Sequence, residues 1–218
     1  MCYTAKDSLN AYIINLISSF LLFFNTSDTD FKIISMFFLF VGQMQIFDYL
    51  FWTNKECNKT NKYVTRTAII FNHLQPVILF LLLNFYEYQQ NPLALISIIL
   101  YSVFAIQYTI KIWPDENCQV SDSVCCSLPH NPDDKDQVIN WQWNHQPSNR
   151  IVYALFLIYL TFGGLSFKNN KLLFVLLNLG SFFISTKIPK LNQSVGRIWC
   201  YMASLMPGFL LVYDKMIK

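Results

Sequence analysis

Long apolar segments constrain the fold of this chain more than any other feature of its sequence. Seven of them, each 17–24 residues long, recur between polar breaks. A membrane helix needs about 20 residues to cross about 30 Å of hydrocarbon, so each segment is long enough to span. The first and sixth are the shortest, which leaves six spans as the alternative to seven. The segments are Ser8–Phe24, Phe31–Trp52, Tyr63–Tyr86, Pro92–Trp113, Arg150–Phe167, Lys171–Lys187 and Ser194–Tyr213.

The composition agrees with a membrane protein. Hydrophobic residues make up 54% of the 218 residues and charged residues only 13%, whereas a soluble domain carries about 25% charged residues. The net charge of +3 is too small to indicate a polyanionic partner. These values exclude a soluble nucleic-acid binder, a disordered chain and an ordinary cytosolic enzyme. We therefore expect membrane lipids, and no nucleic acid, among the partners.

Only helices are expected within the apolar segments, because hydrocarbon offers no hydrogen-bond partner for backbone N–H and C=O groups. We predict an all-α fold, a polytopic membrane protein in which residues 1–218 form one bundle of seven (alternatively six) transmembrane helices. The fourth and fifth helices are joined by a polar segment of 36 residues, 114–149. A connector of that length is usually functional or disordered, and we expect a small polar cap here.

Seven spans place the loops alternately on two faces of the membrane. Face A holds the N-terminus, the loops 53–62 and 188–193 and the segment 114–149; face B holds the loops 25–30, 87–91 and 168–170 and the C-terminus. All six cysteines and eleven of the sixteen Lys and Arg residues lie on or near face A. The basic residues favour a cytoplasmic face A, whereas disulfides would favour an external one. Because the cysteines and most basic residues gather there, face A is expected to be the functional face. Face B is expected to be plain, that is, without functional groups.

Polar side chains inside the apolar segments are the candidate ligand-binding residues, because a charge at the centre of a membrane helix costs roughly 2.5–3.5 kcal/mol. Gln45 and Asp48 share one helical face of the second segment. An ion pair between Asp48 and Arg197 is expected, with Arg66 as the rival partner. Together with His73 of the third segment, these residues are expected first to hold helices together through hydrogen bonds. The alternative is a polar pocket that opens to face A.

The 114–149 segment carries residue types that bind zinc. Cys118, Cys125, Cys126 and His130 have the spacing C-x6-C-C-x3-H, which matches no common zinc pattern. They are weak metal candidates, so we predict neither a metal nor a cofactor. A disulfide from Cys118 to Cys125 or Cys126, or reduced thiols, are the alternatives. No local signature of a hydrolase or a metalloprotease occurs in the sequence.

Several small and aromatic residues are explained by packing or by the membrane interface. The GGLS sequence at 163–166, and Ser181 and Ser185, favour close helix packing. Three tryptophans near segment ends are typical of an aromatic belt at the membrane surface. They are Trp52, Trp113 and Trp199.

Several of these features recur together in one order along the chain. They are Met1-Cys2-x-Thr4 with Ser8, QIFDYLFW at 45–52, HLQP at 73–76, the cysteine-bearing segment with His130 and Trp141-x-Trp143, and SVGRIWC at 194–200. In this order the chain resembles an uncharacterised family of multi-pass membrane proteins of nucleocytoplasmic large DNA (giant) viruses. The resemblance implies a protein of a viral or host-derived membrane, and it implies no reaction.

Three classes of function follow from the sequence. The first is a structural or interaction component of a viral or virus-modified membrane, which would dock other membrane or virion proteins through residues 114–149. The second is a small-molecule or lipid binder, transporter or channel that uses Gln45, Asp48, His73 and Arg197. The third is an intramembrane lipid-modifying enzyme with His73 as general base and Asp48 as its orienting group. We rank them in this order, which makes an enzyme the least favoured class.

Overall fold

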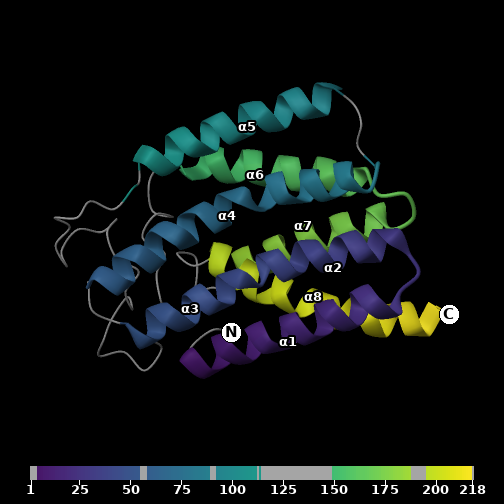
Figure 1. The fold of residues 1–218 in the computed structure, drawn as a ribbon, viewed down its shortest axis with the longest axis horizontal. Coiled ribbons are helices and arrows are strands. Elements are labelled where there is room, and N and C mark those ends of the chain that lie inside the picture. Colours follow the sequence, from purple (N-terminus) through teal and green to yellow (C-terminus); the bar gives the residue numbers. More distant parts are fainter. Residues whose placement is uncertain are drawn as a thin grey trace.

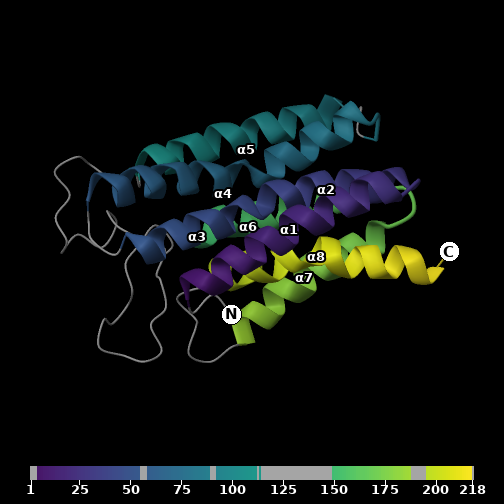
Figure 2. The same cartoon turned by 60° about the horizontal axis from the view of Figure 1, so that its bottom comes forward.

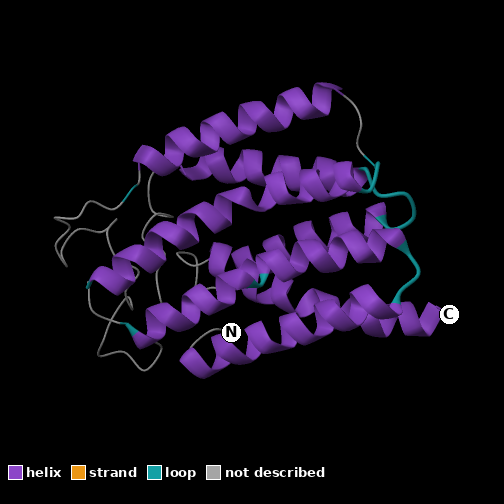
Figure 3. Ribbon diagram, in the orientation of Figure 1, coloured by secondary structure: helices purple, strands orange, loops and turns teal. Residues whose placement is uncertain are grey.

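The computed structural model describes residues 4–54, 58–88, 92–111, 113, 149–187 and 195–217. At residues 149, 150, 195–197 and 217 it describes the backbone but not the side chains. These ranges contain helices and loops, and no strand (Figure 3). The predicted all-α fold is thus confirmed for this part of the chain. The polar cap predicted at 114–149 lies outside it, apart from Asn149 at the start of a helix.

The described helices run side by side along one long axis (Figure 1). Four helical stretches are long and apolar enough to cross a membrane: α1, the combined stretch of α2 and α3, α4 and α5. The helices are α1 (Ala5–Asn25), α2 (Thr29–Val41), α3 (Gln43–Thr53), α4 (Lys59–Phe85), α5 (Pro92–Lys111), α6 (Asn149–Leu165), α7 (Lys171–Lys187) and α8 (Val195–Ile217).

Each predicted apolar segment lies on one helix, except the second, which is divided between α2 and α3 at Gly42. The chain therefore runs the length of the bundle seven times in the described ranges. The start of α1 and the end of α8 lie at opposite ends of the bundle (Figure 1). The loops between α1 and α2 and between α6 and α7 share the end at which α8 finishes, which corresponds to face B.

Gly42 interrupts the second segment, which the sequence predicted as one continuous helix. The Gly42 N–H still donates to the Phe38 carbonyl at 2.8 Å, so the two helices stay nearly in line. A Cβ atom on Gly42 would lie only 2.1 Å from Asn15 Oδ1 of α1. The Asn15 amide donates to the carbonyls of Phe38 (3.1 Å) and Ser204 (3.0 Å). The missing side chain thus makes room for a bridge that joins α1, α2 and α8.

Side chains just before three helices define where those helices begin. Thr4 accepts a hydrogen bond from the backbone N–H of Asp7 at the start of α1. Asp28 does the same for Asp30 in α2, and Asn58 for Asn61 in α4. Thr, Asp and Asn are common N-caps because their oxygens satisfy N–H groups that have no intrahelical partner.

The outer surface of the bundle is more apolar than that of a soluble protein. Large apolar side chains are more than half exposed on α1, α4, α5, α6, α7 and α8. Examples, one per helix, are Ile17, Leu81, Leu100, Phe162, Leu176 and Val212. Uncharged polar and acidic side chains are buried instead, among them Asn15, Asp30, Asp48, Asn72, Asn178 and Asp214. The outer surface therefore exposes many large apolar side chains, while the mainly apolar interior also holds polar ones.

Small residues bring the helices close together, as the sequence predicted. A Cβ atom on Gly163 would lie 2.7 Å from Leu79 Cδ2 of α4, and one on Gly164 would lie 2.6 Å from Phe174 Cδ1 of α7. Ser181 and Ser185 are buried on α7, which confirms their predicted packing role.

The tryptophans only partly follow the prediction of an interfacial belt. Trp113 is 41% exposed and can lie at a membrane surface. Trp52 and Trp199 are 7% and 3% exposed, so the prediction is wrong for both. The Trp199 indole N–H donates to the Asn178 carbonyl at 3.2 Å, and its ring packs edge-on against Phe156. Trp199 therefore holds α8 against α6 and α7 from inside the bundle.

Helix α5 lies at one edge of the bundle, far from α1 and α8 (Figure 2). Its buried residues Ile98, Tyr101 and Ala105 form a small apolar cluster with side chains of α4 and α6, apart from the main core. Two tyrosine hydroxyls join the three helices: Tyr101 donates to the His73 carbonyl at 3.1 Å, and Tyr159 donates to the Ser97 carbonyl at 2.9 Å. These contacts attach α5 to α4 and α6 at the edge of the bundle.

Candidate functional site

Two of the four predicted site residues lie on α3. Gln45 and Asp48 are both fully buried there, on the same helical face as the sequence predicted. Arg197 lies in the first turn of α8, and its side chain falls outside the described part of the chain. The ion pair between Asp48 and Arg197 stays a prediction.

His73 lies in a different environment. Its ring packs edge-on against Tyr108 of α5 at a centroid distance of 5.4 Å and lies 6.3 Å from the ring of Tyr153 of α6. Phe71, two residues earlier, instead contacts Phe40 of α2 and Phe47 of α3. Two residues correspond to about 200° of rotation around a helix, so His73 points away from α3. The described contacts do not bring His73 to Asp48, and the pair required for a base with its orienting carboxylate is not formed.

The predicted metal candidates fall outside the described residues. They are Cys118, Cys125, Cys126 and His130. Within the described ranges, no group of three or more His, Cys, Asp or Glu side chains could hold a metal ion. The docking role predicted for residues 114–149 also falls outside these ranges and stays a prediction.

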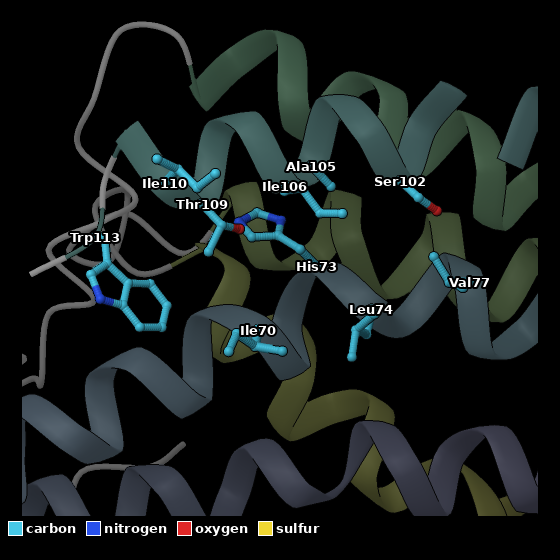
Figure 4. Close-up of a pocket in the computed structure, with 10 residues that line it drawn as sticks. All are labelled: Ile70, His73, Leu74, Val77, Ser102, Ala105, Ile106, Thr109, Ile110 and Trp113. Carbon is cyan, nitrogen blue, oxygen red and sulfur yellow. The ribbon is translucent and has the colours of Figure 1, made fainter. Parts of the chain in front are cut away.

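The site that the structure does build around His73 is a groove of about 560 Å³ between α4 and α5. This volume lies within the range of about 300–1,000 Å³ that small-molecule pockets occupy. The groove opens at the outer surface, because several residues along it are 37–69% exposed. Figure 4 shows the residues that line it. They are Ile70, His73, Leu74, Val77, Ser102, Ala105, Ile106, Thr109, Ile110 and Trp113.

His73 is the buried polar group of this groove. Its side chain is 3% exposed, and its ring projects from α4 toward Ile106 and Thr109 of α5 (Figure 4). Neither Nδ1 nor Nε2 has a hydrogen-bond partner among the described residues. A neutral imidazole carries one donor and one acceptor, and a buried polar group without a partner costs about 1–3 kcal/mol. The imidazole is therefore available to a ligand that enters the groove.

Two polar side chains near His73, those of Asn72 and Ser102, already have hydrogen-bond partners. The Asn72 amide donates to the Tyr153 hydroxyl at 3.0 Å. The Ser102 hydroxyl donates to the Ile98 carbonyl of its own helix at 2.7 Å. His73 is thus distinguished from these two groups, and a ligand with a polar atom deep in the groove could reach its imidazole.

The two ends of the groove differ in polarity. Trp113 lies at one end, and Val77 and Ser102 lie at the other (Figure 4). The Arg66 guanidinium carbon lies 5.4 Å from the centroid of the Trp113 ring, within the range of a cation–π contact. This end belongs to face A, where α4 begins and α5 finishes. The groove is therefore amphipathic along its length, with a cation at the face A end and apolar walls beyond it.

The sequence did not lead us to predict the α5 residues that line the groove, although their spacing follows a helical pattern. Ser102, Ile106, Thr109 and Trp113 follow the spacing i, i+4, i+7 and i+11, which places them on one face of a helix. The signal is weak because the two polar residues among them lie within a largely apolar helix. The pattern also does not indicate which helix lies opposite.

Face B contains a hydrogen-bonded cluster, which corrects the expectation that this face is plain. The Asp30 carboxylate is fully buried at the start of α2. It accepts the backbone N–H groups of Lys168 (3.3 Å), Asn169 (2.7 Å) and Asn170 (2.7 Å), just before α7. The Asn170 amide also donates to Asp28 at 3.0 Å. We call this arrangement the Asp30 clamp; it joins α2 to the α6–α7 loop.

Tyr88 and Lys168 complete the surroundings of the clamp. Burial, a hydrogen bond with the Asp30 carboxylate and the nearby negative charges raise the pKa of the Tyr88 phenol to about 12. The phenol therefore stays protonated and remains a donor to Asp30 throughout the neutral range. The Lys168 ammonium lies 4.4 Å from the centroid of the Tyr88 ring. All the groups of the clamp are engaged with one another, which identifies it as a structural element.

Comparisons of the chain with protein-family models, with curated proteins and with solved structures found no match.

Proposed function

We propose that the chain is a polytopic integral membrane protein that crosses the bilayer seven times. The apolar outer surface supports this proposal: exposed apolar side chains suit lipid, and buried groups such as Asn15 and Asp48 avoid it. The resemblance to the giant-virus membrane family extends the proposal to a viral or virus-modified host membrane.

The membrane topology can be tested with a terminal tag at each end of the chain. We expect the protein to resist extraction with alkaline carbonate and to dissolve in detergent. In sealed vesicles, protease should remove one tag and leave the other protected, because an odd number of spans puts the ends on opposite sides. Equal accessibility of both tags would support six spans, and release by carbonate would contradict membrane insertion.

We further propose that the protein binds a membrane lipid, with one acyl chain in the α4–α5 groove and one polar atom of the lipid at His73. The observation that carries this proposal is the unpartnered, buried imidazole in a groove that opens toward the lipid-facing surface. Apolar walls with a few polar groups are typical of small-molecule sites. Helix α5 supplies one wall from the edge of the bundle, so a lipid can enter sideways from the bilayer.

Filling the groove is expected to abolish this binding. Ala105 is 6% exposed and lines the groove, so Ala105→Phe places a phenyl ring in the space that the acyl chain needs. In nanodiscs containing a phosphatidylcholine with a photoreactive acyl chain, cross-links to residues of the groove should fall about tenfold relative to cross-links on α1. Ser102→Phe at the far end of the groove should act in the same direction.

Val103→Phe is the matched control for these variants. Val103 lies on the same helix, is 49% exposed and does not line the groove. It introduces the same ring, and the cross-linking pattern should stay as in the wild type. Unchanged cross-linking in a folded Ala105→Phe or Ser102→Phe protein would refute the lipid site.

A further inference from the structure

We infer that the groove selects an anionic glycerophospholipid of the face A leaflet, with its phosphate at Arg66 and Trp113 and an ester carbonyl oxygen at His73. The inference rests on the proposed lipid site and adds the charge, the linkage and the orientation of the ligand.

The charge follows from the face A end of the groove. Arg66 is half-buried and holds its guanidinium over the Trp113 ring, which itself lines the groove. Arginine recognises phosphate through charge-assisted hydrogen bonds from a planar set of donors. A long basic side chain near a helix end can keep its charge at the headgroup level while its stem lies on apolar surface. Tryptophan is enriched at the same level of the bilayer.

The orientation follows from the order of groups along α4. Arg66, Ile70 and His73 share one helical face, with Arg66 nearest to face A. Seven residues of helix separate Arg66 from His73, or about 10 Å along the axis. A lipid therefore enters with its headgroup at face A and its acyl chain directed toward Val77 and Ser102.

The linkage follows from the chemistry of His73. Between the phosphate and the acyl chains, a glycerophospholipid carries ester carbonyl oxygens, which accept hydrogen bonds and do not donate them. A neutral imidazole supplies one N–H donor. Both His73 nitrogens lack partners among the described residues, so a donor is available for such an oxygen. The second nitrogen, as an acceptor, does not oppose this contact.

Retention of lipids by the purified protein tests the charge selectivity. Native mass spectrometry would compare phosphatidylglycerol with phosphatidylcholine carrying identical acyl chains. We expect about fivefold stronger retention of phosphatidylglycerol by the wild type. Arg66→Gln should remove this preference by weakening phosphatidylglycerol retention, and it should weaken phosphatidylcholine retention to a smaller extent, because that lipid carries the same phosphate beside a choline cation. Lys6→Gln, which removes an exposed cation at the start of α1 on the opposite edge of the bundle, should leave the preference intact.

A diether analogue of phosphatidylglycerol tests the carbonyl contact. The analogue lacks the ester oxygens, so the wild type should retain it about fivefold less than the ester lipid. His73→Phe should bind both lipids alike, because the donor is absent. Comparing the two lipids in both the wild type and His73→Phe separates the loss of the hydrogen bond from any general effect of the substitution on folding.

The outcomes distinguish this inference from the proposed lipid site. Equal retention of the two headgroups, with loss of both in Ala105→Phe, would overturn the charge selectivity and leave the lipid site standing. Equal retention of ester and diether lipids by the wild type would overturn the role of His73. Retention of both headgroups that Ala105→Phe does not change would overturn the lipid site itself.

Discussion

Asp30→Ala is expected to lower the free energy of unfolding by about 4 kcal/mol, because it removes the acceptor that holds three backbone N–H groups of residues 168–170. Hydrogen bonds to a charged group contribute about 1.5–3 kcal/mol each, and a buried donor left without a partner costs about 1–3 kcal/mol. The N-terminus of α7 also loses a negative charge that its helix dipole favours. Few other side chains in the described ranges satisfy so many distant groups at once.

Unfolding in detergent, followed by tryptophan fluorescence, to which the buried Trp52 and Trp199 contribute, would measure this loss. The melting temperature of Asp30→Ala should fall by many degrees, or the variant should fail to elute as a folded species. Asp30→Asn keeps the shape and one acceptor oxygen but turns an amide N–H₂ toward N–H donors, so it should recover only part of the loss.

Asp7→Ala is the matched control. Asp7 also lies in the first turn of a helix, but among the described residues its carboxylate accepts only the exposed Thr4 hydroxyl, at 2.9 Å. We expect it to cost less than about 1 kcal/mol. If Asp30→Ala melted as close to the wild type as Asp7→Ala does, the Asp30 clamp would have no structural role.

The Asp30 clamp shows what a sequence of this kind cannot reveal. Asp28 and Asp30 precede an apolar segment, which is enough to predict a helix start and an N-cap. The partners of Asp30 are backbone N–H groups of residues 168–170, about 140 positions further along the chain. Backbone groups leave no trace in residue identity, so no pattern could have indicated this contact. Face B was therefore expected to be plain.

The helices themselves could be predicted because their cause is local. An apolar segment of about 20 residues in a chain with few charges has helix as its stable form in lipid. The predicted segments accordingly lie on helices throughout the described ranges. The small residues at 163–166 and on α7 also indicated close packing correctly. Each of these predictions needed only information within one segment.

The candidate site could be predicted only in part, because it depends on which helix covers which face. Helical spacing correctly put Gln45 and Asp48 on one buried face. It also identified His73 as a polar group deep within its segment. Periodicity gives no information about neighbours, however, and the face of His73 is covered by α5 and α6, away from α3. The same limitation applies to Trp52 and Trp199, since nearness to a segment end does not decide whether a side chain points inward.

The interruption of the second apolar segment at Gly42 also has its cause far away in the sequence, because Asn15 of α1 occupies the space beside this residue. Gly42→Ala is expected to destabilise the protein by about 2 kcal/mol, the middle of the range for overpacking a filled site. The new Cβ would lie 2.1 Å from Asn15 Oδ1 and 2.4 Å from Asn15 Cγ. Asn15 cannot yield easily, because its amide is held by the carbonyls of Phe38 and Ser204. Relief of the clash would therefore break the bridge between α1, α2 and α8.

Gly180→Ala provides the matched control, since both positions lie within helical stretches. No atom lies within 4 Å of a Cβ on Gly180, so the substitution meets no neighbour among the described residues. It should stabilise the protein by about 0.5–1 kcal/mol, the usual gain for Gly→Ala in a helix interior. Melting temperatures in detergent should thus shift in opposite directions for the same chemical change.

The double variant Asn15→Ala, Gly42→Ala identifies the mechanism. Once Asn15 is shortened, the methyl group added at position 42 no longer meets it, so the double variant should be no less stable than Asn15→Ala alone. This non-additivity is expected for residues in direct contact. Additive losses would show instead that Gly42 is needed for the geometry of the α2–α3 junction itself. Its φ of −61° and ψ of −19° are open to any residue, which argues against that outcome.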